Sequence, residues 1–111
     1  MARYLLVESR DPFATDDVRH FYDLPASLAR AFNRVTLYLT RDGVLAARAG
    51  QHTFWIAALT SAGVEILADA DALRERGIAV EQLSPGVRVI GSGHELPLVA
   101  LMSCKQDVRL S

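Results

Sequence analysis

Two aspartates, Asp69 and Asp71, follow an apolar run at residues 64–68 and open a helix-length segment that Gly77 closes. In an open parallel sheet, ligands bind at the corner between the carboxyl end of a strand and the following helix. Carboxylates at the start of a helix can also cap its free backbone N–H groups. The spacing therefore predicts either a binding corner or a capped helix, and the other side chains at the same edge decide between them.

Polar side chains follow each predicted strand, and parallel strands bring such loops to one edge of the sheet. They are Glu8, Ser9, Arg10 and Asp11 after the first strand, Thr40, Arg41 and Asp42 after the second, Asp69 and Asp71 after the third, and Ser92 and His94 after the fourth. The binding candidates among them are Asp69, Asp42, Arg10, Arg41, Ser92 and His94. Polar residues are also typical of solvated loops with no ligand.

Metal and phosphate motifs are weak in this chain. A magnesium-binding receiver site would need adjacent acids after the first strand and a lysine after the fifth, whereas the chain has Glu8-Ser9 and no such lysine. The turn Gly91-Ser92-Gly93 can cradle a phosphate with backbone donors, but no lysine-serine pair completes a P-loop. The sequence therefore predicts no metal site and no cofactor.

Cys104 is the single cysteine, which excludes an internal disulfide and a multi-cysteine zinc site. It ends a predicted apolar helix at residues 95–104, where a free cysteine usually behaves as a small buried hydrophobe. If the thiol were exposed, the adjacent Lys105 would favour its thiolate form. No serine-histidine-acid order or nucleophile elbow is present. Cys104 is thus the one candidate nucleophile.

Apolar runs of strand length alternate with helix-length segments. The predicted strands are 3–9, 34–40, 64–68 and 87–91, with a weaker one at 107–111. Alternation of this kind predicts an α/β fold with parallel strands covered on both faces. The first helix is expected to begin near Asp16 or Asp17 and to be kinked or split at Pro25, and Asn33 is expected to take the left-handed turn after it.

Composition predicts a single domain over residues 1–111 that associates with other subunits. Half of the 111 residues are hydrophobic and 23% are charged, and the segment 52–63 is apolar on nearly every side, so we expect it at a subunit interface. A net charge of -1 without blocks of one sign excludes the footprint of nucleic acid or anionic lipid. No signal peptide or membrane span is evident, which predicts a cytoplasmic location.

Four stretches in order resemble the DsrE/DsrF-like family of small sulfur-relay proteins. They are RYLLVESRDPF, SLARAFNRVTLYLTRDGVLAAR, GVEILADADALRERGI and GVRVIG. The resemblance implies a three-layer α/β/α sandwich with a five-stranded, mostly parallel sheet, assembled into homotrimers or homohexamers. It also implies a persulfide-carrying cysteine just after the third strand, eight residues before Gly77, where this chain has Asp69.

The aspartate decides the expected mechanism, because sulfur transfer needs a thiolate that attacks and then releases sulfur. The sequence thus predicts a non-catalytic binding or partner subunit that associates with itself and with sulfur-relay proteins. Two alternatives stay open. One is a sulfurtransferase that uses Cys104. The other is a binder of small anions or nucleotide phosphates that uses Arg10, Arg41, Ser92 and Gly93.

Overall fold

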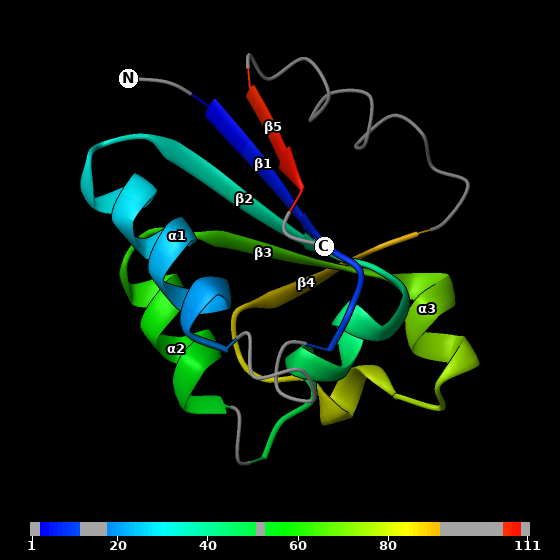
Figure 1. Ribbon diagram of the computed structural model, residues 1–111. Coiled ribbons are helices and arrows are strands. Elements are labelled where there is room, and N and C mark those ends of the chain that lie inside the picture. Colours follow the sequence, from blue (N-terminus) through cyan, green and yellow to red (C-terminus); the bar gives the residue numbers. More distant parts are fainter. Residues whose placement is uncertain (1–2, 12–17, 51–52, 92–105, 110–111) are drawn as a thin grey trace.

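The computed structural model describes residues 3–11, 18–50, 53–91 and 106–109 (Figure 1). The elements in chain order are β1 (Arg3–Glu8), α1 (Val18–Arg30), β2 (Arg34–Leu39), the 3-10 helix η1 (Arg41–Ala47), α2 (Thr53–Ser61), β3 (Glu65–Asp69), α3 (Ala70–Glu75), the 3-10 helix η2 (Val80–Gln82), β4 (Val87–Ile90) and β5 (Gln106–Arg109). Among these described residues, no helix is both long and apolar enough to cross a membrane.

The strands form one parallel sheet in the order β4-β3-β2-β1-β5. Leu39 is in register with Glu8 on one side and with Ala68 on the other, and Asp69 is in register with Ile90. The carboxyl ends of β1 to β4 therefore lie along one edge. The predicted α/β class and the parallel arrangement of the four main strands are confirmed.

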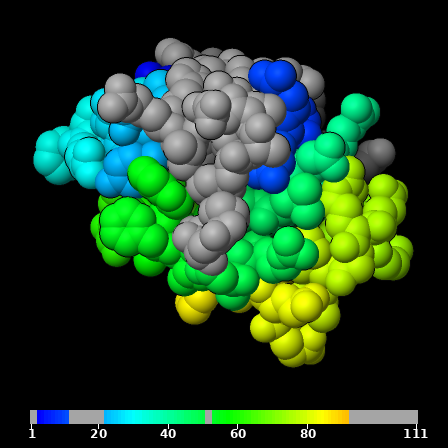
Figure 2. All heavy atoms as spheres, turned by 60° about the horizontal axis from the view of Figure 1, so that its bottom comes forward, coloured from blue at the N-terminus to red at the C-terminus, as the bar shows by residue number. Residues whose placement is uncertain are grey.

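The main hydrophobic cluster lies on one face of the sheet. In register across β1, β2 and β3, Leu6, Leu37 and Ile66 are fully buried and belong to one hydrophobic cluster. The helices add Ala26 from α1, Val44 from η1, Ile56 and Leu59 from α2, and Leu73 from α3 to the same cluster. Figure 2 shows the outer surface of these elements. The described helices thus cover the same face, and the predicted helix 95–104 lies outside the described residues.

The opposite face of the sheet carries both polar and apolar side chains. Thr36 and Tyr38, which alternate with the buried residues of β2, are only partly buried. The Thr36 hydroxyl donates to Glu65 Oε1 at 3.4 Å, and the Arg88 guanidinium donates to Glu65 Oε2 at 3.1 Å. On this face, Thr36, Glu65 and Arg88 therefore satisfy one another by hydrogen bonds. Coverage of the sheet on both faces stays a prediction.

The first helix differs from expectation at two points, and its predicted start lies outside the described residues. Pro25 does not split it, because α1 continues from Val18 to Arg30 and Pro25 is fully buried. The left-handed residue is Phe32, with φ 66°, and not Asn33. Instead, Asn33 supplies hydrogen-bond donors to a carbonyl near the end of the helix. Its Nδ2 donates to the Leu28 carbonyl at 3.0 Å, and its backbone N donates to the same oxygen at 3.3 Å.

Candidate functional site

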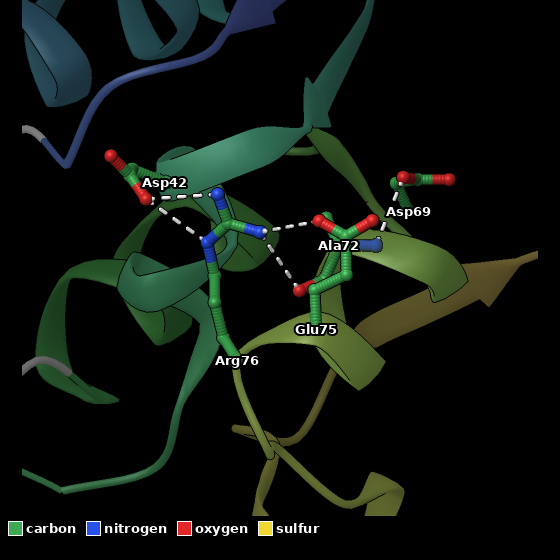
Figure 3. Close-up of polar contacts among 5 residues, drawn as sticks. All are labelled: Asp42, Asp69, Ala72, Glu75 and Arg76. Atoms are coloured by element: carbon green, nitrogen blue, oxygen red, sulfur yellow. Dashed lines mark hydrogen bonds and ion pairs between the residues drawn. The ribbon is translucent and has the colours of Figure 1, made fainter.

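Asp69 lies at the corner between β3 and α3. Its backbone is extended, with φ -72° and ψ 124°, and its Oδ2 accepts a hydrogen bond from the Ala72 backbone N at 3.1 Å (Figure 3). The aspartate is therefore the N-cap of α3. A cap of this kind stabilises a helix by about 1 kcal/mol relative to alanine. Helix capping, one of the two roles that the sequence allowed, is thus the role that the structure shows.

Tyr38 is the side chain at this corner that sequence reasoning missed. It is in register with Leu67, and Asp69 follows two residues later on the same face of the sheet. The Tyr38 hydroxyl donates to the Asp69 carboxylate and accepts from the Thr40 hydroxyl. Burial raises the pKa of Tyr38 above its ordinary value, and the negative charge of Asp69 raises this pKa further. Tyr38 therefore stays a hydrogen-bond donor to Asp69 at neutral pH.

These contacts fix what the corner can do chemically. Asp69 accepts hydrogen bonds from one backbone N–H and from one phenol. Oxygen of this kind is hard and cannot carry sulfane sulfur as a thiolate does. The Asp69 side chain is therefore a hydrogen-bond acceptor and holds no sulfur atom for such chemistry.

A second polar group joins η1 to the end of α3. The Arg76 guanidinium contacts Asp42 Oδ1 through Nη2 at 2.9 Å and through Nε at 3.0 Å. Its Nη1 donates to the Ala72 carbonyl at 3.2 Å and lies 3.6 Å from Glu75 Oε2. Arginine in the last turn of a helix often bonds the free carbonyls there, and this was the available sequence signal for Arg76.

The predicted candidates Asp42 and Asp69 do not share one cluster. In Figure 3, Asp69 lies on the opposite side of Ala72 from the Arg76 guanidinium and Asp42. Asp71, at the start of α3, pairs instead with Arg74 at 3.1 Å. Within the described part of the chain, no group of three or more histidine, cysteine, aspartate or glutamate side chains is placed to hold a metal ion.

The ends of β1 and β2 are held against each other by backbone contacts. The Thr40 backbone N donates to the Glu8 carbonyl at 3.0 Å, which extends the ladder by one step. A Cβ at Gly43 would overlap the same Glu8 carbonyl oxygen, so only glycine fits there. Glu8 itself is 3% exposed, and its Oε2 accepts from the Arg10 backbone N at 3.4 Å.

Arg10 and Arg41 leave the sheet from these two adjacent strand ends. Both are exposed, and Arg41 adopts a left-handed backbone with φ 50°. The register that pairs Glu8 with Leu39 places their backbones at equivalent positions after β1 and β2. The remaining predicted site residues, Ser92, His94 and Cys104, and also Gly93, lie outside the described residues. Their roles stay predictions.

Two solved structures share the fold of this chain. The YchN protein from E. coli has a TM-score of 0.79 at 19% identity, and the match covers 99% of this chain and 100% of that one. MTH1491, a protein of unknown function from Methanobacterium thermoautotrophicum, has a TM-score of 0.74 at 22% identity, covering 98% and 99% respectively. No protein-family model and no curated protein matches the chain.

At these identities, the likeness concerns the fold alone. It extends over nearly the full length of both neighbours, which are proteins of the DsrE/YchN-like fold. The DsrE/YchN-like fold that the sequence resemblance indicates is therefore confirmed.

Proposed function

We propose that this chain is a non-catalytic binding subunit of the DsrE-like type, which works beside intracellular sulfur-relay proteins and lacks their sulfur-carrying thiol. The observation that carries the proposal is Asp69 at the β3–α3 corner, where the resemblance implies a cysteine. Its carboxylate is engaged by the Ala72 N–H and by Tyr38. The fold shared with YchN and MTH1491 supports comparing the β3–α3 corner of this chain with the position at which the resemblance implies a cysteine.

Persulfide transfer requires an atom that attacks sulfane sulfur and later releases it to an acceptor. A carboxylate oxygen does neither, so binding at this edge is non-covalent. Recognition then depends on hydrogen bonds and charge along the carboxyl edge. A cytoplasmic location is part of the proposal, because that is where a sulfur relay would meet its partner proteins.

The proposal includes association into a homotrimer or homohexamer. Helix α2 supports it, since this helix carries no charged residue and buries only Ile56 and Leu59, while Phe54 is 70% exposed. The ring of Trp55 lies edge-on to Phe54 at 5.6 Å and to Tyr22 at 5.3 Å between centroids, which extends the aromatic surface onto α1. The proposal also includes the three-layer sandwich with a five-stranded sheet that the resemblance implies.

A persulfide acceptor assay tests the proposal. The purified chain is incubated with a sulfur donor and analysed by intact mass and peptide mapping. We expect no sulfur adduct that turns over, and a Cys104→Ser chain should behave like the wild type. The matched gain-of-function variant is Asp69→Cys in the Cys104→Ser background, which should accept one sulfur atom at position 69.

Two results would contradict the proposal. Turnover of the donor by the wild type that is lost in Asp69→Ala would show that the carboxylate itself is catalytic. Turnover that is lost in Cys104→Ser would instead favour the sulfurtransferase alternative. A persulfide confined to the introduced cysteine supports the proposal.

A further inference from the structure

The loops after β1 and β2 are fixed relative to each other. Thr40 N donates to the Glu8 carbonyl at 3.0 Å, Gly43 N donates to the Thr40 carbonyl at 2.9 Å, and the Gly43 backbone packs directly on the Glu8 carbonyl. The residues between and beside these contacts include Arg41 and Arg10. Two arginines therefore follow neighbouring strand ends whose backbones are hydrogen-bonded to each other.

Three carboxylates at the carboxyl ends of β1 to β3 are buried or bonded to other groups. Asp42 contacts Arg76 at 2.9 Å, and Asp69 accepts from the Ala72 N–H and from Tyr38. Glu8 is buried. In the part of the chain that the structure describes, no ion pair or hydrogen bond is formed by the Arg41 guanidinium. Its positive charge is thus left for a group from solution.

The backbone of Arg41 adds an independent observation. A residue with a Cβ rarely adopts φ 50°, because the left-handed conformation is unfavourable for L-residues other than glycine, asparagine and aspartate. Such conformations persist where the surroundings impose them and are frequent at binding sites. Glycine at position 41 would relieve the strain but would remove the exposed cation from the carboxyl edge.

We propose that Arg41, with Arg10 on the adjacent loop, binds a phosphate group at the carboxyl edge of β1 and β2. The planar guanidinium matches two oxygens of a phosphate and carries its charge at every physiological pH. The site deepens the proposed binding function by naming the chemical class of its ligand, and it rests on that function being non-covalent. Free phosphate and the phosphates of a nucleotide present the same chemistry to it.

An NMR titration tests the site on the full chain. Backbone amide shifts are followed at constant ionic strength while inorganic phosphate is added, and separately while ADP is added. We expect saturable shifts at residues 40–43 and at Arg10, with a Kd on the order of 1 mM for phosphate. Tighter binding of ADP would identify a nucleotide as the source of the phosphate, and equal affinity would identify the free ion.

Variants that each lose one positive charge distinguish binding at this site from a general electrostatic effect. Arg41→Gln should weaken phosphate binding about tenfold, because a charge-assisted hydrogen bond is lost. Arg10→Gln should weaken it less. The control is Arg34→Gln, since Arg34 is also exposed and lies at the other end of β2. It should change the affinity less than about twofold, because its charge is distant and screened.

The proposal is overturned if the shifts do not saturate, or if Arg34→Gln and Arg41→Gln weaken binding equally. A matching amide spectrum of each unliganded variant shows that the variant is folded. The result is distinguishable from that of the persulfide assay, because one experiment reads amide shifts at residues 40–43 and the other reads sulfur adducts on cysteine. Failure of the phosphate site leaves the non-covalent role of Asp69 intact.

Discussion

The Arg76 guanidinium contacts the Asp42 carboxylate at 2.9 and 3.0 Å and thereby ties the end of α3 to the start of η1. Arg76 is mostly buried, with 23% of its side chain exposed, whereas Asp42 is 63% exposed. Solvent screening at Asp42 limits what the pair contributes. Its effect on the molecule is chiefly to fix η1, which carries Arg41, against α3.

The Asp42–Arg76 pair should have a measurable but small coupling energy. We expect a double-mutant cycle with Asp42→Asn and Arg76→Gln to give a coupling of about 0.5 to 1 kcal/mol in urea unfolding. Arg76→Gln alone should cost more than Asp42→Asn, because it also removes the bond to the Ala72 carbonyl. The exposed pair of Asp71 and Arg74 serves as the control cycle. A coupling near zero at low salt would contradict this prediction.

Asp69 should contribute to stability as a cap. Asp69→Ala removes the acceptor for the Ala72 N–H, so we expect a loss of about 1 kcal/mol in the free energy of unfolding. Asp69→Asn keeps an oxygen acceptor and should lose less than half of that. Chemical denaturation measures both variants. Equal losses would mean that the charge of Asp69, and not the capping bond, provides its stabilisation.

Tyr38 should make stability fall at alkaline pH. Its folded-state pKa is raised above the ordinary value of 10.0 by burial and by Asp69, so the folded protein holds this proton more tightly than the unfolded chain. The resulting stabilisation is complete below the ordinary value and is lost as pH rises through the raised pKa. Tyr38→Phe has no phenol to ionise, so this part of the loss of stability at alkaline pH should disappear.

Asp69→Asn provides the matched test of the cause. It removes the negative charge that disfavours tyrosinate, so the pKa of Tyr38 should move down toward its ordinary value. Ultraviolet titration of tyrosinate in the folded protein measures the shift. An unchanged pKa of Tyr38 would show that burial alone sets it.

Gly43 should tolerate no side chain. Gly43→Ala places a Cβ against the Glu8 carbonyl, where backbone must shift, and we expect a loss of at least about 2 kcal/mol. Gly77→Ala is the comparison, because Gly77 has φ 67° but open space around a Cβ. That variant should lose about 1 kcal/mol from backbone strain alone. Thermal unfolding of both variants shows which one loses more stability. A smaller loss for Gly43→Ala would contradict the close approach of Gly43 to the Glu8 carbonyl.

Phe54 should matter for association. Phe54→Asp puts a charge on the exposed aromatic surface of α2, and we expect native mass spectrometry at micromolar protein to shift toward smaller species. Val80→Asp is the control, since Val80 is 64% exposed on η2. Helical content by circular dichroism should stay unchanged in both. A wild type that is already monomeric would contradict the interface.

The sequence could place the strands because their local patterns agree with the fold. The run RVTLYLT predicted a strand at 34–40, and β2 spans Arg34–Leu39 with Val35, Leu37 and Leu39 buried. The third strand is displaced by one residue and ends at Asp69, which begins the helix as predicted. Capping depends on residues three apart in the chain, so local sequence contains the information for it.

Contacts between distant segments were not predictable in the same way. Whether Tyr38 meets Asp69 depends on the register of β2 with β3, and Arg76 reaches Asp42 across 34 positions of sequence. At the end of α1, Phe32 and not Asn33 takes the left-handed turn, since Asn33 uses its side chain on the Leu28 carbonyl. Even at this short range, a side-chain hydrogen bond outweighs the preference of asparagine for the left-handed conformation.

By itself, the amino-acid sequence determined the α/β class, the strand positions and the aspartate at the β3–α3 corner, because these follow from periodicity and from short-range hydrogen bonding. Only the tertiary structure decided which charges are neutralised at the carboxyl edge. It pairs Asp42 with Arg76, sets the neutral Tyr38 hydroxyl against Asp69, and leaves Arg41 exposed in a left-handed conformation. Charge pairing depends on distances of a few ångströms between segments, which the packing of the sheet and helices sets.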